Sequence, residues 1–265
     1  MQEAVNHYRS IWISDVHLGT RGCKAEYLLD FLQHNACRYL YLVGDIIDGW
    51  RLQRGGNWAA SHNEVVRKVL RAAREGTQVM YIPGNHDEMF RDYEDMHFGG
   101  VVVVNEAVHE MADGRKFLVI HGDEFDGVTM HAKWLAHLGD WAYDRVLLMN
   151  SGFNYLRRKL GYPYWSLSAY LKHKVKNAVN FISDFECAVA EEARRRGVDG
   201  VICGHIHKAE MRMIGEVLYC NDGDWVESCT ALVEDDSGNL EIVNWAAVMA
   251  MESANAQNAG RAHAA

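Results

Sequence analysis

The sequence predicts a layered α/β fold, and three observations support this. In the first 120 residues, short runs rich in β-branched and aromatic residues alternate with stretches of helical periodicity. Further β-rich runs follow after residue 200. The chain has 265 residues, of which 49% are hydrophobic and 24% charged, so it can bury a large core.

The elements of the first half follow from periodicity and turn residues. The helix expected at about 62–75 should end at Gly76, because glycine commonly follows a helix C-terminus. Asp113-Gly114 between two apolar runs predicts a hairpin. The expected strands are 9–14, 39–43, 78–82, 101–104, 107–111 and 116–120, and the expected helices are about 24–36 and 62–75.

Residues about 125–183 interrupt this alternation and are interpreted as a helical insertion into a single domain, 1–249. A new helix is expected to begin at Ser183, because Ser183 and Glu186 match a capping box, and to end at Gly197. The Ala- and Asn-rich residues 250–265 are expected to form a flexible tail. The later strands are expected at 200–203, 210–214, 216–220, 230–233 and 240–245, with turns at 214–215 and 235–239.

Composition argues against several classes of protein. The formal net charge of −9 disfavours nucleic acid as a partner. No apolar run reaches the roughly 18 residues of a membrane-spanning helix, and the N-terminus does not match a secretory signal. None of the six cysteines forms a C-x-x-C pair, so we expect reduced thiols in a cytoplasmic protein. The sequence predicts no oligomeric state.

Ligand-type side chains stand at the end of five predicted strands, and the C-terminal edge of an α/β sheet is where ligands bind. Carboxylates and imidazoles with one amide, and no thiolate, suit Mn²⁺, Fe or Zn²⁺. Each motif alone is a weak signal. Seven candidates are too many for one ion and favour two ions sharing a carboxylate. The candidate ligands are Asp15, His17, Asp45, Asn85, His121, His205 and His207.

Together, D-x-H, G-D-x-x-D, G-N-H-D, H-G and G-H-x-H resemble the calcineurin-like metallophosphoesterase superfamily from about residue 9 to 246. The resemblance implies a four-layer αββα sandwich with a helical lid, and attack by a hydroxide that bridges two metals through Asp45. The implied ligands of one ion are Asp15, His17, Asp45 and His207, and those of the other are Asp45, Asn85, His121 and His205.

His86 is the histidine of these motifs that is not an implied ligand. It resembles the family histidine that contacts the phosphoryl oxygen and protonates the leaving group, and an imidazole suits that role because its pKa lies near neutrality. Asp87 or Asp48 is expected to orient His86 or a ligand imidazole, so all three are candidate catalytic residues.

The insertion carries the main clue to the substrate. Residues 145–183 contain seven Lys or Arg, seven aromatic residues and no Asp or Glu, which leaves 20 basic against 36 acidic residues elsewhere. This composition suits an anionic lipid or a membrane surface. Two other interpretations remain: a helical cap with solvated lysines, and a nucleic-acid-binding surface.

Within the superfamily the chain resembles the UDP-2,3-diacylglucosamine diphosphatase group of lipid A biosynthesis, through W-I-S-D-V-H-L, G-D-I-I-D-G-W, H-G-D and G-D-W (223–225). That resemblance implies Mn²⁺-dependent cleavage of a pyrophosphate to UMP and an acylated sugar 1-phosphate, with acyl chains held by the lid. The chain departs from the group's G-N-R-D, because His86 replaces an arginine that can only bind phosphate. Expected substrate contacts are Asn85, His86, Trp50, Arg51, Ser168, Lys172 and Lys176.

The leading hypothesis is therefore a diphosphatase of a nucleotide-linked lipid, acting peripherally at the cytoplasmic face of a membrane. A general phosphodiesterase or phosphatase for soluble esters is the second. A non-catalytic scaffold with this fold is the third, although every ligand type is present. A nuclease is disfavoured by the acidic remainder of the chain.

Overall fold

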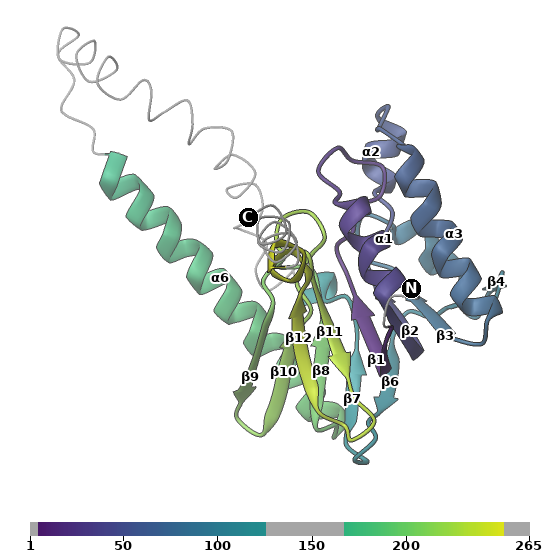
Figure 1. The fold of residues 1–265 in the computed structure, drawn as a ribbon. Coiled ribbons are helices and arrows are strands. Elements are labelled where there is room, and N and C mark those ends of the chain that lie inside the picture. The colour runs from purple at the N-terminus through teal and green to yellow at the C-terminus, as the bar shows by residue number, and fades with distance from the viewer. Residues whose placement is uncertain (1–4, 126–166, 252–265) are drawn as a thin grey trace, which may run out of the picture. The chain divides into compact units, whose positions relative to one another are not determined.

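The computed structural model describes residues 5–125 and 167–251 (Figure 1). The chain divides into two compact units, residues 1–123 with 190–265 and residues 124–189. Within the second unit, the helix α6 (Leu167–Arg196) is described from its first residue, and its final turns from Ala190 belong to the first unit. Most of the predicted insertion lies outside the described residues.

The first unit contains a mixed seven-stranded sheet with the order β12-β11-β1-β2-β3-β5-β4. Strands β1, β2, β3 and β5 run parallel, and β4, β11 and β12 pair antiparallel. The bounds are β1 Asn6–Ile13, β2 Asn35–Val43, β3 Gln78–Ile82, β4 His97–Phe98, β5 Val101–Val103, β11 Thr230–Glu234 and β12 Leu240–Asn244.

A second sheet has five strands in the order β6-β7-β8-β10-β9. Its three central strands, β7, β8 and β10, are parallel, and β6 and β9 are antiparallel edges. The bounds are β6 Ala107–Glu110, β7 Lys116–Val119, β8 Gly200–Cys203, β9 Glu210–Ile214 and β10 Val217–Asn221.

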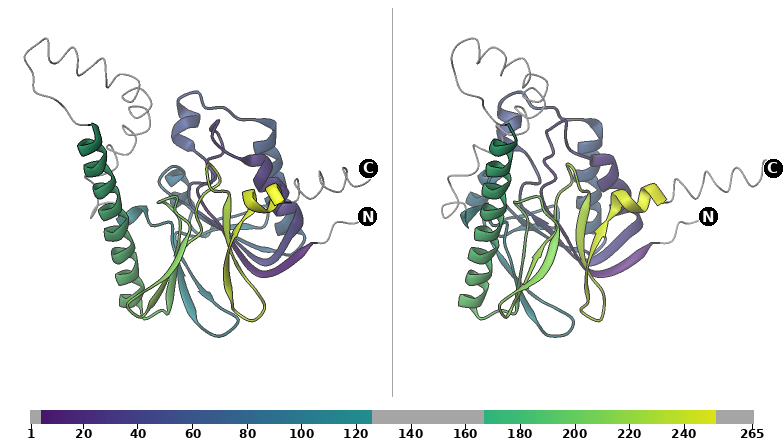
Figure 2. Two further views of the ribbon diagram at one scale, coloured as in Figure 1. Left: turned by 60° about the vertical axis from the view of Figure 1, so that its left-hand side comes forward. Right: turned by 90° about the vertical axis from the view of Figure 1, so that its left-hand side faces the viewer.

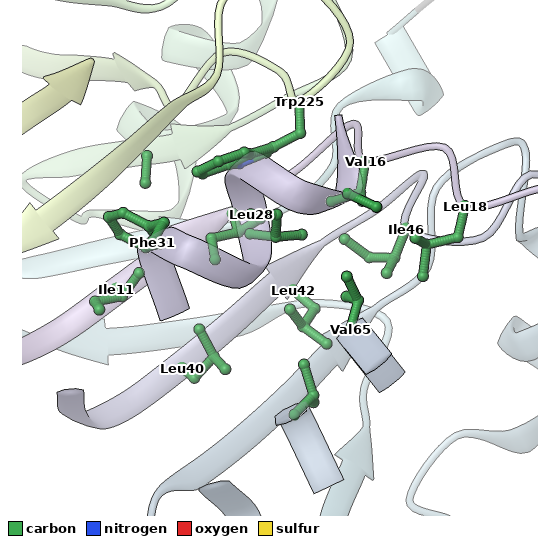
Figure 3. Packing of buried hydrophobic residues seen from close by; sticks show 14 of the residues in the cluster. Ile11, Val16, Leu18, Leu28, Phe31, Leu40, Leu42, Ile46, Val65 and Trp225 are labelled. Atoms are coloured by element: carbon green, nitrogen blue, oxygen red, sulfur yellow. The ribbon is translucent and has the colours of Figure 1, made fainter. Parts of the chain in front are cut away.

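The two sheets pack face to face, and helices cover the other face of the larger sheet (Figures 1 and 2). These helices are α1 (Ala25–His34) and α3 (Ala60–Arg74). In Figure 3, Phe31 and Leu28 of α1 lie beside Trp225, with Ile11 on the neighbouring β1; the rings of Phe31 and Trp225 are 5.4 Å apart. Three short helical segments each follow a strand: α2 (Gly49–Gln53) follows β2, the 3₁₀ helix η1 (Glu88–Tyr93) follows β3, and η2 (Asp123–Phe125) follows β7.

Strand alternation explains how one strand serves two layers. In β1, Ile11 and Ile13 face the helices, whereas Trp12 faces the second sheet; in β2, Leu42 and Tyr41 divide in the same way. Because both faces are buried, these strands appear in the sequence as continuous apolar runs. The predicted α/β fold class, with two stacked sheets, is confirmed.

The predicted helix start at Ser183 is wrong, because α6 runs from Leu167 through this residue to Arg196. A serine caps a helix only where the preceding backbone leaves the helical conformation, and no glycine or proline occurs within α6 to cause this. The strands at 78–82, 200–203 and 210–214 have the predicted bounds. Helix α2 and strand β4 were not predicted, because elements this short show no periodicity.

The described residues end in a short helix at 245–251, so the predicted flexible tail lies almost wholly outside them. Within residues 5–125 and 167–251, no helix combines the length and the apolar character needed to span a membrane.

Candidate metal centre

The five motifs lie on the loops that follow β1, β2, β3, β7 and β8, as the sequence predicts. Backbone hydrogen bonds continue beyond the strands and hold these loops together. The amide of Asp15 donates to Gly44 O at 3.0 Å, and that of His17 donates to Asp45 O at 2.8 Å. Gly204 N donates to His121 O at 3.3 Å in the second sheet. The C-terminal ends of both sheets therefore bring the ligand-type side chains together.

Two groups of side chains offer ligand atoms that lie within 4.8 Å of one another. The first is Asp15, His17 and His207, and the second is Asp45, His121 and His205. A third grouping, His17 with Asp45 and His86, overlaps both sets of loops. The site therefore contains ligand clusters that could bind metal ions, and Asp45 stands where the groups meet.

Each central carboxylate uses one oxygen to hold the backbone and directs the other toward the imidazoles. Asp15 Oδ2 accepts from His205 N at 2.8 Å, while its Oδ1 lies 3.0 Å from His207 Nε2. Asp45 Oδ1 accepts from His86 N at 2.8 Å, while its Oδ2 lies 3.5 Å from His121 Nε2. The carboxylates are thus placed by the fold before any ion binds.

The imidazoles are oriented by their other nitrogen atoms. His121 Nδ1 lies 2.9 Å from Val43 O, and His17 Nδ1 lies 3.3 Å from Asp48 Oδ2. These contacts leave the Nε2 atoms of both rings for the centre. Such contacts fix the ring plane and the tautomer of a metal-binding histidine.

Five candidate ligand residues adopt a left-handed backbone conformation that non-glycine residues rarely occupy. The φ angles are 50° for Asp15, 52° for His17, 53° for Asp45, 74° for His205 and 53° for His207. Strain of this kind costs of order 1–3 kcal/mol per residue and persists where the surrounding structure imposes it. Its concentration here indicates a functional centre.

Opposite charges dominate the electrostatics. Burial would raise the pKa of Asp15, but the imidazoles of His207, His121 and His17 hold it well below the ordinary value. Burial would lower the pKa of His121, but Asp45 and Asp15 raise it to about 10. In the same way Asp15 raises the pKa of His207 to about 9 against the effect of burial. A cation that binds here would therefore compete with protons for these imidazoles.

The asparagine fits the same interpretation. Asn85 Oδ1 is buried and has no hydrogen-bond partner in the described part of the chain. A buried amide oxygen without a partner is uncommon and suggests a cation as its partner. The neighbouring Gly84 is also constrained, because a Cβ there would lie 2.4 Å from Asp45 Oδ1. The donor set therefore suits hard or borderline divalent metals.

His86 lies at the edge of the clusters, with 24% of its side chain exposed. Its Nδ1 is 3.1 Å from Asp48 Oδ2, and its Nε2 is 4.0 Å from Asp45 Oδ2. Burial would lower the pKa of His86, but Asp48 and Asp45 raise it above the ordinary value. Asp48 therefore contacts the Nδ1 atoms of both His86 and His17, whereas Asp45 lies near their Nε2 atoms.

Asp87 has different contacts from those expected of a residue that orients an imidazole. It is fully buried, and its carboxylate accepts from the amides of Gly84 and Ile46 at 2.6 and 2.8 Å and from Tyr81 Oη at 2.5 Å. Weaker contacts reach the amides of Asp45 and Ile47. Burial, together with Asp45, raises the pKa of Asp87. The structure thus assigns Asp87 to loop geometry and the imidazole contact to Asp48.

The expected substrate contacts fall into two sets. The indole of Trp50 packs on His86 with ring centroids 4.3 Å apart, whereas Arg51 is exposed and its backbone amide donates to Asp48 Oδ1. Ser168, Lys172 and Lys176 lie on α6, in the stretch whose side chains are outside the described residues.

Two further residues near the centre were not predicted as site residues. Ser14 Oγ lies 2.6 Å from Asp15 Oδ2 and 2.5 Å from Asp222 Oδ1, and Asp222 is fully buried. The hydroxyl thus connects the carboxylate of Asp15 to the loop after β10. Asp222 follows a strand, as the ligand motifs do, and this was the only signal in the sequence.

Comparison with known proteins places the chain in a family. A sequence model described as calcineurin-like phosphoesterase matches residues 8–209. UDP-2,3-diacylglucosamine hydrolase of Haemophilus influenzae is 23% identical over 248 residues, covering 88% of this chain and 98% of that protein. The Porphyromonas gingivalis protein of the same name is 28% identical over 124 residues, 42% of this chain and 44% of its own.

Solved structures with a similar chain course include Yfce, a phosphoesterase from E. coli, with a TM-score of 0.43, 14% identity, and coverage of 89% of this chain and 98% of that chain. Vps29 of Entamoeba histolytica with Zn²⁺ has a TM-score of 0.42, 15% identity, and the same two coverages. The match across residues 8–209 spans all five ligand-bearing loops. The chain belongs to the calcineurin-like phosphoesterase family and is a metal-dependent phosphoesterase.

Proposed function

We propose that this phosphoesterase hydrolyses the pyrophosphate bond of UDP-2,3-diacylglucosamine, or of a similar nucleotide-linked lipid. The products are UMP and an acylated sugar 1-phosphate. The observation that carries the proposal is the match to a protein named UDP-2,3-diacylglucosamine hydrolase along 98% of that protein's length. The ligand-bearing loops of this chain support the hydrolytic chemistry.

Two divalent cations, Mn²⁺ in the first instance and Fe or Zn²⁺ as alternatives, are the proposed cofactors. One would be held by Asp15, His17, Asp45 and His207, and the other by Asp45, Asn85, His121 and His205. A pair of such ions lowers the pKa of water and neutralises charge on a phosphoryl group. The chemistry of the donor set, oxygen and imidazole nitrogen without sulfur, suits these metals.

The remaining residues of the site act on the substrate itself. The Nε2 edge of His86 faces the centre, where it can contact a phosphoryl oxygen and deliver a proton to the departing group. Asp48 Oδ2 lies 3.1 Å from Nδ1, at the opposite edge of the ring. Asp87 holds the backbone that carries Asn85 and His86 against the loop of Asp45.

The lipid part of the proposal rests on composition. The seven basic and seven aromatic residues of 145–183 suit an acylated, anionic substrate at a membrane surface. We propose that this segment, with Ser168, Lys172 and Lys176, contacts the acyl chains and phosphates. Peripheral membrane contact at the cytoplasmic face follows from the same proposal.

A second candidate function, a phosphodiesterase for soluble esters, is favoured by His86. A sugar phosphate leaves as a stable anion and needs little protonation, whereas an alcohol needs a proton as it departs. A histidine held by Asp48 at 3.1 Å is equipped for the second task. The two candidates therefore differ in leaving group and in dependence on lipid.

One experiment separates them. Purified protein with Mn²⁺ and detergent is assayed for UMP release from UDP-2,3-diacylglucosamine, beside bis-p-nitrophenyl phosphate as a soluble diester. The proposal predicts preferred turnover of the lipid, and its loss in the His86→Ala variant. Turnover of the soluble diester alone would refute the lipid assignment and leave the second candidate.

A further inference from the structure

Trp50 packs against His86, although the proposed hydrolysis needs no chemical group from its side chain. We infer that Trp50 is a positioning residue, whose indole holds the imidazole of His86 in the plane that directs Nε2 into the metal centre. The inference rests on the proposed role of His86 and adds a determinant of its orientation.

Asp48 alone does not fix the ring, because Nδ1 of His86 makes no hydrogen bond within the described part of the chain. Asp48 Oδ2 lies 3.1 Å from His86 Nδ1, but the same oxygen lies 3.3 Å from His17 Nδ1 and is shared between the two rings. A single contact of this kind restrains rotation about the Cβ–Cγ bond of His86 only loosely, because this torsion has broad minima and polar contacts tolerate a wide range of angles. A second contact, on the face of the ring, is needed to select one plane.

Trp50 supplies that face contact. Its ring centroid is 4.3 Å from that of His86, with 35° between the planes, so the two rings are in close, tilted contact. His17 meets the same ring edge-on, at 4.7 Å and 89°. Three contacts of different geometry thus surround the imidazole: a carboxylate at Nδ1, an indole on a face and an imidazole edge.

The backbone explains why Trp50 is in place. Asp48 Oδ1 accepts from Arg51 N at 2.8 Å and caps the short helix α2, on which Trp50 is the second residue. The amide of Gly49 donates to His86 O at 2.9 Å, and a Cβ at Gly49 would itself lie 2.9 Å from that oxygen. The sequence Asp48-Gly49-Trp50 therefore joins the carboxylate, the close approach and the indole.

Exposure supports a function beyond packing. Trp50 leaves 41% of its surface exposed, so its contribution to the buried core is small. A large aromatic residue kept at the mouth of a polar centre, with one face against His86, suits positioning better than stabilisation. A matched control exists in Trp58, which is 38% exposed and contacts His62 instead.

The test combines a structural readout with kinetics. In the metal-free protein, the ring protons of His86, identified by their absence from the His86→Asn spectrum, should shift upfield under the indole. This shift should vanish in Trp50→Leu, persist in Trp50→Phe in reduced form, and be unchanged in Trp58→Leu. A His86 signal that does not respond to Trp50→Leu would overturn the inference.

Kinetics then test whether the contact matters. The substrate is glycerophosphoethanolamine, a soluble diester with an alcohol leaving group. On this substrate, Trp50→Leu should lower kcat about tenfold without changing KM, because a misplaced His86 loses part of the rate enhancement that a general acid provides. Trp50→Phe should restore most of it. In the His86→Asn background, Trp50→Leu should have no further effect. Additive losses, or a raised KM with unchanged kcat, would refute positioning.

The outcomes remain distinguishable from those of the proposed function. Failure to release UMP from the lipid removes the substrate assignment, while the spectrum of His86 and the double-variant cycle still decide the role of Trp50. Conversely, lipid turnover with an unresponsive His86 spectrum removes the positioning role alone.

Discussion

Asp87 offers the sharpest test of how the loops of the centre are held. The substitution Asp87→Asn keeps the shape of the side chain but converts one acceptor oxygen into an NH₂ donor. Each carboxylate oxygen accepts at least two hydrogen bonds in the structure: Oδ1 from the amides of Gly84 and Asp45, and Oδ2 from Tyr81, Ile46 and Ile47. The new NH₂ group must therefore face donors in either orientation.

The loss of unfolding free energy is estimated for the orientation of the new side-chain amide that loses fewer hydrogen bonds. If the amide oxygen takes the place of Oδ2, two hydrogen bonds to Oδ1 are lost, at 2.6 Å from Gly84 N and 3.3 Å from Asp45 N. A buried donor left without a partner costs about 1–3 kcal/mol. The second bond is long, so we expect the free energy of unfolding to fall by about 3 kcal/mol.

The assay is urea denaturation followed by far-UV circular dichroism in EDTA, so that metal binding does not enter the comparison. Asp236→Asn, at an exposed carboxylate, is the matched control and should change the free energy of unfolding by less than about 0.5 kcal/mol. A loss below about 1 kcal/mol for Asp87→Asn, at an unchanged m-value, would show that the carboxylate does not hold the loops.

Three further predictions concern the centre and the sheet interface. Gly84→Ala should abolish metal-dependent turnover, because the added Cβ would lie 2.4 Å from Asp45 Oδ1. An unchanged circular dichroism spectrum with weaker Mn²⁺ binding in calorimetry would support this reason. Full activity of the variant would contradict it. Chelation should abolish activity, and added Mn²⁺ should restore it. The affinity for Mn²⁺ should rise from pH 6 to pH 9, because the protons of His121 and His207 (pKa about 10 and about 9) become easier to displace. An affinity that does not change with pH would refute this electrostatic explanation. Glu234→Gln should lower the free energy of unfolding by about 3 kcal/mol, because Glu234 is buried against Arg9 at 2.9 Å. Burial would raise the pKa of Glu234, but hydrogen bonds from His109 and neighbouring groups hold it below the ordinary value, so its contribution is present at neutral pH and lost on acidification. In urea titrations, the difference in unfolding free energy between the wild type and Glu234→Gln should therefore narrow as the pH falls below 4.5, the ordinary glutamate pKa. A difference that widens would contradict the assignment.

The positions of the ligand motifs were predictable because parallel strands present their C-terminal ends at one edge. A run such as that before Asp45 is apolar on both faces, and the polar residues begin where the strand ends. The neighbouring strands follow the same rule, so the sequence placed the ligand-bearing loops of both sheets at one site. What it could not supply was the distance between individual atoms.

Other features depend on contacts between residues far apart in the chain. Asp87 resembles the other acidic residues of the motifs, and only the backbone amides of Ile46 and Gly84 reveal its task. Glu234 and Arg9 are separated by 225 positions, and no local pattern joins them. The capping-box pattern at Ser183 failed for the converse reason, because a local signal was overruled by uninterrupted helical sequence on both sides.

The strand order has a consequence for how the protein is made. Strand β1 lies between β2 and β11, so its sheet is complete only when residues 230–234 are available. His207, which lies in one cluster with Asp15, and His205, whose amide donates to Asp15, are also synthesised late. Because the ribosome adds about 5–20 residues per second, His205 and His207 are synthesised roughly ten seconds or more after Asp15 and His17. The nascent chain thus carries Asp15 and His17 without their partners, and this cluster is complete only after most of the body has left the ribosome.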